Sequence, residues 1–252
     1  MKIQFYLIQI NNTLMQSILI IETQVLFTGI FPLPSNKSDQ INRIYCKFIC
    51  NNQETDYLIT TKAIPDMSSA LDITHLRYPN ELEVIFGFGN LIKQLNPQII
   101  TGYNIHQFDF NYIRDRLLFW NDNDYSESNF TKAFDLTWVE EPRQSNALGF
   151  QTIKYYQYSN SKPVDLFQKS RIQYELKSYK LSDVLFDLLG LKVTYTNLRE
   201  SNRIFSSEES GFEEQEKIIK EELVIMDNLK KLFQLVMTDT VKKIYESIKE
   251  TN

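Results

Sequence analysis

The sequence has 252 residues, of which 42% are hydrophobic and 13% aromatic, so it can bury the core of one large domain and does not have the composition of a disordered chain. Its formal net charge of −5 argues against broad, unspecific binding to nucleic acid, because surfaces that follow phosphates are usually rich in Lys and Arg. A local basic strip remains compatible with this charge.

Residues 1–16 form a short N-terminal extension ahead of the first predicted strand. They are hydrophobic, but Gln9, Asn11 and Asn12 interrupt them, and they offer no small-residue cleavage site. The extension therefore fits neither a signal peptide nor a membrane span, and we expect no membrane among the partners. With only two cysteines in the chain, a reducing intracellular compartment is the favoured location.

Three strands are predicted in the first quarter of the chain. Residues 17–27 are rich in β-branched and aromatic side chains, and a polar turn separates two further runs at 41–50 and 55–61. Strands joined in this way indicate an antiparallel meander. Cys46 and Cys50 lie on one face of the second strand; since no second pair or nearby His completes a zinc set, we interpret them as core residues.

A helix is predicted over residues 79–95, although Gly87 and Gly89 weaken the pattern. Another strand follows at 98–103, and because a helix leads into it we expect it to run parallel to its neighbour in a mixed sheet. The next helix begins near Asp109. Its carboxylate can serve as an ordinary helix N-cap or as one member of a site with acids from elsewhere in the chain.

Residues 121–162 are polar and aromatic and are interpreted as an inserted region that contains a hairpin. Beyond them the pattern predicts a short helix that ends at Gly190, a mobile loop over 192–211, and then a long amphipathic helix or two abutting ones. Residues 239–252 are treated as a C-terminal tail.

Three segments resemble the proofreading exonuclease domain of family B DNA polymerases. "NPQIITGYNIHQFDFNYIRDRL" resembles the second exonuclease motif. "ETQVLFTGIFPLPSNKSDQINRI" is similar to the segment after the first motif in delta-type polymerases, and "VDLFQKSRIQYELKSYKLSDVLFDLLG" to the segment that leads into the last motif. They occur in the family's order. The resemblance implies an α/β, ribonuclease H-like domain over residues 17–238, with a mixed sheet of about five strands flanked by helices.

The resemblance also implies a site with two divalent cations, Mg or Mn, held by carboxylates around the phosphate to be cleaved. Three acids match the motifs and are the expected catalytic and metal-binding residues: Glu22, Asp109 and Asp227. Two positions depart from the motifs. Ile20 stands where the first motif has Asp, and Leu223 stands where the last motif has Tyr, so we expect metal binding and hydrolysis to be strongly impaired.

Each of these residues also has a simpler interpretation. Glu22 lies in an apolar strand, where burying a lone carboxylate is costly, so a site role is favoured. Asp227 could instead be a solvated residue of a charged helix. Asn104, Tyr103 and Phe108 are the expected contacts to nucleic acid, since aromatic faces accept any base, but core packing explains the two aromatic residues as well.

Two functional hypotheses follow. The chain is either a 3′→5′ exonuclease domain that acts weakly on single-stranded DNA 3′ ends, or a non-catalytic module that binds single-stranded DNA or another replication protein. A protein-binding role unrelated to DNA is a third option. The resemblance implies a nuclear location. No palm motif of a polymerase is found after Phe233, so we expect no polymerisation from this polypeptide.

Overall fold

The computed structural model describes residues 17–25, 31–62, 71–120, 135–145, 149–158, 160–194, 196–206 and 211–250. The predicted extension over 1–16 lies outside these residues, as do parts of the predicted inserted region. No helix in the described part of the chain is both long and apolar enough to cross a membrane.

The main sheet is mixed and has six strands in the order β4-β3-β2-β1-β5-β8. Strands β1 to β3 form the predicted antiparallel meander, while β5 runs parallel to β1 and β8 parallel to β5. The α/β fold class is confirmed, with one strand more than expected. The bounds are β1 (Ser17–Val25), β2 (Ile41–Cys50), β3 (Gln53–Thr60), β4 (Ile73–Arg77), β5 (Ile99–Gly102) and β8 (Lys162–Asp165). The short β4 was not predicted, because its five residues carry no clear apolar alternation.

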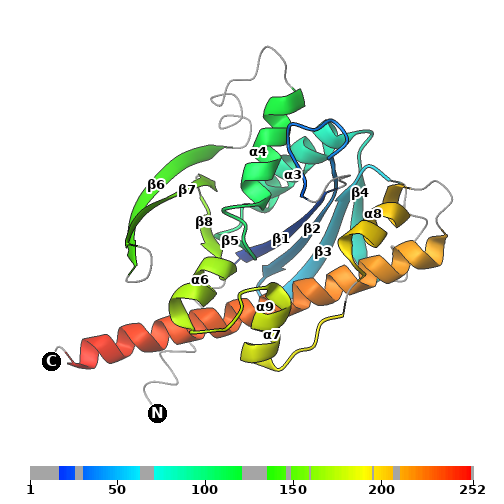
Figure 1. Ribbon diagram of the computed structural model, residues 1–252. Coiled ribbons are helices and arrows are strands. Elements are labelled where there is room, and N and C mark those ends of the chain that lie inside the picture. The colour runs from blue at the N-terminus through cyan, green and yellow to red at the C-terminus, as the bar shows by residue number, and fades with distance from the viewer. Residues whose placement is uncertain are drawn as a thin grey trace.

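Helices cover both faces of this sheet, and Figure 1 shows the long helix α9 crossing one face with α6, α7 and α8 beside it. Helices α3 and α4 pack on the opposite face. Strand β1 alternates between the two cores: Leu19 and Ile21 face α3 and α4, whereas Ile18 and Ile20 face α9. The helix bounds are α3 (Glu81–Leu95), α4 (Asp109–Trp120), α6 (Leu166–Gln173), α7 (Leu181–Leu189), α8 (Leu198–Ser206) and α9 (Phe212–Glu250).

Helix α3 is continuous through both of its glycines. Asn80 caps its first turn and Asn96, in the left-handed conformation, ends it. Gly87 leaves room for Tyr78, since a Cβ there would lie 2.2 Å from the ring and would displace that side chain. One of the glycines that weakened the sequence prediction, Gly87, therefore makes room for the Tyr78 ring beside the helix.

Strands β6 (Leu136–Ser145) and β7 (Gly149–Tyr158) form a separate antiparallel hairpin that extends away from the main sheet (Figure 1). The predicted hairpin arm over residues 153–158 is part of β7. At its base, Tyr158 and Leu136 are buried in the core beneath α4.

The predicted loop over 192–211 was wrong in one respect, because it contains helix α8. Asn197 caps that helix by accepting a hydrogen bond from the backbone N–H of Glu200 at 3.0 Å. Ile204 and Phe205 anchor the helix in the core beneath α9. Helix α9 is a single helix that continues to Glu250, through residues that the sequence analysis treated as part of the tail.

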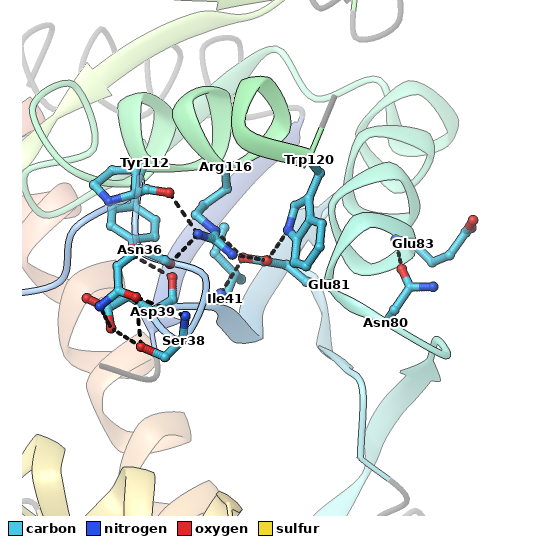
Figure 2. A network of polar contacts seen from close by, with 11 residues as sticks. Asn36, Ser38, Asp39, Ile41, Asn80, Glu81, Glu83, Tyr112, Arg116 and Trp120 are labelled. Atoms are coloured by element: carbon cyan, nitrogen blue, oxygen red, sulfur yellow. Dashed lines mark hydrogen bonds and ion pairs between the residues drawn. The ribbon is translucent and has the colours of Figure 1, made fainter. Parts of the chain in front are cut away.

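A buried ion pair holds the segment 31–40 against α3 and α4 (Figure 2). The guanidinium of Arg116 donates to both carboxylate oxygens of Glu81, at 2.8 and 2.6 Å. The same group donates to the backbone carbonyls of Pro34 and Asn36, each at 2.7 Å. The segment that follows β1 is thereby fixed in place, close to the candidate site described next.

Candidate active site

Asp109 is brought to β1 by a close approach of two backbones. A Cβ at Gly102 would lie 2.6 Å from the carbonyl oxygen of Ile21, so only glycine lets the end of β5 approach β1 this closely. Asp109, at the start of α4, then accepts a hydrogen bond from the backbone N–H of Thr23 at 2.9 Å. Its carboxylate therefore connects α4 to β1 beside Glu22.

The charges of two carboxyl groups, Asp109 from α4 and Glu222 from α9, act on a third, Glu22 from β1. Burial, followed by the charges of Glu222 and Asp109, raises the pKa of Glu22 well above its ordinary value. Burial also raises the pKa of Asp109 to about 7, although the hydrogen bonds with Thr23 act in the opposite direction. Burial raises the pKa of Glu222 to about 7 against the influence of Arg43. Asp109 and Glu222 of this acidic cluster are buried, Glu22 is partly buried, and Arg43 is a neighbouring cation.

A cavity of about 300 Å³ opens beside this acidic cluster. It is bounded by β1, by the turn between β5 and α4, and by α8 and α9. The residues that line it are Glu22, Thr23, Gln24, Val25, Pro32, Tyr103, Phe108, Leu181, Thr196, Ser201, Glu222 and Ile225. The lining thus combines acidic and aromatic residues, which suits a small ligand with both polar and flat apolar parts.

Asp227 is not among the residues that line this cavity. Its carboxylate lies 3.1 Å from the ammonium of Lys47, and its side chain is 53% exposed. Lys47 also contacts Asp56 at 2.8 Å. The structure therefore brings Glu22 and Asp109 together as expected, but it places Asp227 in a separate ion-pair cluster.

Helix geometry explains why Glu222 lies at the cavity and Asp227 does not. Residues five apart on an α-helix are rotated by about 140° relative to each other. Glu222 lies on the same face of α9 as the buried Ile218 and Ile225, whereas Asp227 lies on the exposed side of the helix. Leu223, in the position expected for Tyr, packs partly buried against the core beneath α9.

Ile20 is fully buried in the same core. The register of β1 with β2 places Lys47 directly opposite Ile20 and Tyr45 directly opposite Glu22. The position that should carry the first acid is thus apolar, and a lysine is its neighbour on β2.

Arg43 supplies the cation next to the cluster of three carboxyl groups. It lies opposite Gln24, on the face of the sheet that Glu22 also uses, and it is fully buried. Its Nη2 donates to the hydroxyl of Ser201 at 2.8 Å, and its guanidinium lies 3.7 Å from the centroid of the Phe205 ring. Helix α8 therefore holds Arg43 in place.

The three residues expected to contact nucleic acid lie at the turn between β5 and α4. Tyr103 and Phe108 line the cavity. Tyr103 also donates its hydroxyl to the carbonyl of Tyr179 at 2.5 Å, so its ring is fixed. Asn104 adopts the left-handed conformation, and its backbone N–H donates to Asp165, which caps α6. Asn104 does not line the cavity, and its role in binding stays a prediction.

The comparison with known families agrees with this geometry. Residues 18–184 match the family described as DNA polymerase family B, exonuclease domain. The match includes Glu22 and Asp109 and ends before α9. The chain belongs to this family, and its fold is that of the ribonuclease H-like exonuclease domain.

Individual relatives of low sequence identity are also DNA polymerases. The DNA polymerase catalytic subunit of Epstein-Barr virus (strain B95-8) is 26% identical over 185 residues, which are 72% of this chain and 18% of that protein. The DNA polymerase delta catalytic subunit of Drosophila melanogaster is 24% identical over 161 residues, or 64% of this chain and 15% of the relative. DNA polymerase 120R of Invertebrate iridescent virus 3 is 29% identical over 123 residues, which are 46% of this chain and 10% of that protein. The chain thus spans less than a fifth of the length of these relatives.

Exonuclease domains of this family normally use divalent metal ions, but the donor groups of this chain do not suit them. Ile20 has no ligand atom, and Asp227 is held by Lys47. Next to the remaining carboxyl groups lies the permanent charge of Arg43. Among the described residues, no three His, Cys, Asp or Glu side chains form a group that could hold a metal ion.

Sequence reasoning missed Glu222, Arg43 and Lys47. The apolar spacing of α9 could have identified Glu222, since Ile218, Ile219 and Ile225 recur on its face of the helix. No comparable signal exists for the two basic residues of β2. Their positions depend on the register of that strand with β1.

Proposed function

We propose that this exonuclease domain binds the 3′ end of single-stranded DNA without hydrolysing it efficiently. The observation that carries this proposal is the division of the expected acids into two places. Glu22 borders the cavity, whereas Asp227 is bound by Lys47 outside it. Hydrolysis by two metals requires carboxylates that grip both ions at one phosphate, so this division argues against efficient chemistry.

The lining of the cavity supports the binding part of the proposal. Its volume of about 300 Å³ lies at the lower end of the range for small-ligand pockets and suits one terminal nucleotide. Tyr103 and Phe108 offer aromatic rings, and stacking on such rings does not depend on base identity. The carboxyl-bearing Glu22 and Glu222 lie in the same lining. We extend the proposal to a nuclear place of action and to other replication proteins as partners, by analogy with the family.

The first experiment measures nucleotide release from a 3′-labelled single strand, in Mg²⁺ and then in Mn²⁺. It compares the native chain with the Asp109→Ala variant, after circular dichroism has confirmed that both are folded. We expect no release from either protein. Release by the native chain that disappears in the variant would identify a working exonuclease and overturn the non-hydrolytic assignment.

The second experiment measures binding of a fluorescent single strand by anisotropy at low salt. We expect Phe108→Ala to weaken binding about tenfold, since stacking is worth about 1–3 kcal/mol per base. Ile172→Ala is the matched control, because this residue is 59% exposed on α6 and does not line the cavity. Absence of binding by the native chain would reject the proposal in favour of a role in protein binding.

A further inference from the structure

Lys47 lies at the centre of three carboxylates on the α9 side of the sheet. Its ammonium nitrogen is 2.8 Å from an oxygen of Asp56, 3.1 Å from one of Asp227 and 3.5 Å from one of Glu54. The lysine side chain is only 5% exposed. Carboxylate oxygens that converge on one point are the usual surroundings of a hard divalent cation. In this protein the cation at that point belongs to the chain itself.

The position of Lys47 relative to the motifs is equally specific. The resemblance to the family assigns metal-binding acids to positions 20 and 227. Lys47 lies directly opposite Ile20 in the register of β1 and β2, and its ammonium binds Asp227. A basic side chain thus stands next to both positions.

We propose that the ammonium of Lys47 is a tethered substitute for a divalent cation: it holds Asp227, Asp56 and Glu54 together and keeps metal ions from binding there. The proposal builds on the proposed function, because it gives a reason for the loss of hydrolysis. Its test measures cation binding instead of nuclease activity, so the two can fail separately.

The charge of Lys47 is maintained by its neighbours. Burial lowers the pKa of its ammonium, but the hydrogen bonds and charges of Asp56 and Asp227 outweigh this and raise the pKa above its ordinary value. Lys47 therefore remains a cation over the physiological range. Arg43, on the same face of β2, is a second buried cation and lies near Glu222, so Glu222 and Asp227 of α9 each have a basic partner on that strand.

The test replaces Lys47 by Met, which has a similar shape and no charge, and measures thermal unfolding in EDTA and in millimolar Mn²⁺. Removing the ammonium leaves the carboxylates of Asp56, Asp227 and Glu54 without the cation that they surround. We expect Mn²⁺ to raise the melting temperature of Lys47→Met by about 5 °C, and that of the native chain by less than about 1 °C. Adding Asp227→Asn to the variant should abolish most of the gain.

Two further variants complete the test. Lys230→Met is the matched control, since Lys230 contacts only Glu54 of this cluster and should confer no response to Mn²⁺. If Lys47→Met does not fold in EDTA, recovery of its circular dichroism spectrum on addition of Mn²⁺ supports the proposal, and failure to recover overturns it. The proposal is also overturned if the native chain responds to Mn²⁺ and loses that response on Asp227→Asn.

Discussion

Lys47 and Asp227 form an ion pair that joins the second strand of the sheet to the last helix, with 3.1 Å between the charged atoms. Position 227 is the one at which the family resemblance predicts a metal ligand. The pair therefore shows where the third predicted acid lies and which side chain binds it there.

The strength of this pair can be measured by a double-mutant cycle of Lys47→Met and Asp227→Asn in urea unfolding. We expect a coupling free energy of about 1 kcal/mol or less, because the Asp227 side chain is 53% exposed. The same cycle with Asp56→Asn should give a larger coupling, since Asp56 is only 20% exposed and lies closer to Lys47. Equal coupling free energies in the two cycles would contradict the closer contact and deeper burial of Asp56.

Stability should decrease as the pH rises from about 5 to about 8. Carboxyl groups of the unfolded chain titrate near pH 4, whereas burial raises the pKa of Asp109 and of Glu222 to about 7 in the folded chain. Between these values the folded state binds more protons. The stability that protonation contributes is complete below about pH 4 and is lost as the pH passes through about 7.

The measurement is the urea midpoint at the two pH values, with Glu222→Gln as the control. Glutamine mimics the protonated acid, so the dependence on pH should be weaker in this variant than in the native chain. The opposite result is a urea midpoint that rises with pH by the same amount in the native chain and in Glu222→Gln. It would show that the buried acids are ionised throughout.

Restoring the motif acid with Ile20→Asp should destabilise the domain by about 3 kcal/mol or more. Ile20 is fully buried among apolar side chains, so the substitution both removes packing and buries a carboxyl group. Ile20→Val separates the two effects and should cost only about 1 kcal/mol. Chemical unfolding of both variants checks this, and a well-tolerated Asp would mean that the position is open to solvent.

Arg116→Met should destabilise the domain by about 3–5 kcal/mol, because it leaves the carboxylate of Glu81 buried without its ion partner. The control is Arg203→Met, which breaks an exposed pair with Glu200 and should cause no measurable change. Thermal unfolding monitored by circular dichroism compares the two. Equal effects would mean that the Arg116 pair is far more hydrated than its burial indicates.

Much of the fold could be predicted from local patterns. The meander of β1 to β3 followed from β-branched runs separated by polar turns, and the strand-to-helix turn at Asp109 followed from an apolar strand, a glycine and an amphipathic helix. Helix α8 was missed because it is short and mostly polar, with only Leu198, Ile204 and Phe205 as large apolar residues.

The candidate site was harder to predict because it depends on register. A slip of one residue between β1 and β2 would move Lys47 and Arg43 to the opposite face of the sheet. The register of β1 with β2 depends on the connection that contains the segment 31–40 and on an irregularity between Gln24 and Val25. No local sequence pattern encodes either feature. The spacing of a motif can identify the residue types of a site, but not which basic side chain a neighbouring strand brings to it.

The ion pair of Arg116 and Glu81 has a consequence for how a ligand would enter the cavity. Pro32 forms part of the cavity wall, and the segment that contains it is tied down through the carbonyls of Pro34 and Asn36. This part of the wall is therefore in place before any ligand arrives. Little conformational entropy remains to be lost there on binding, and entry should not wait for this segment to close.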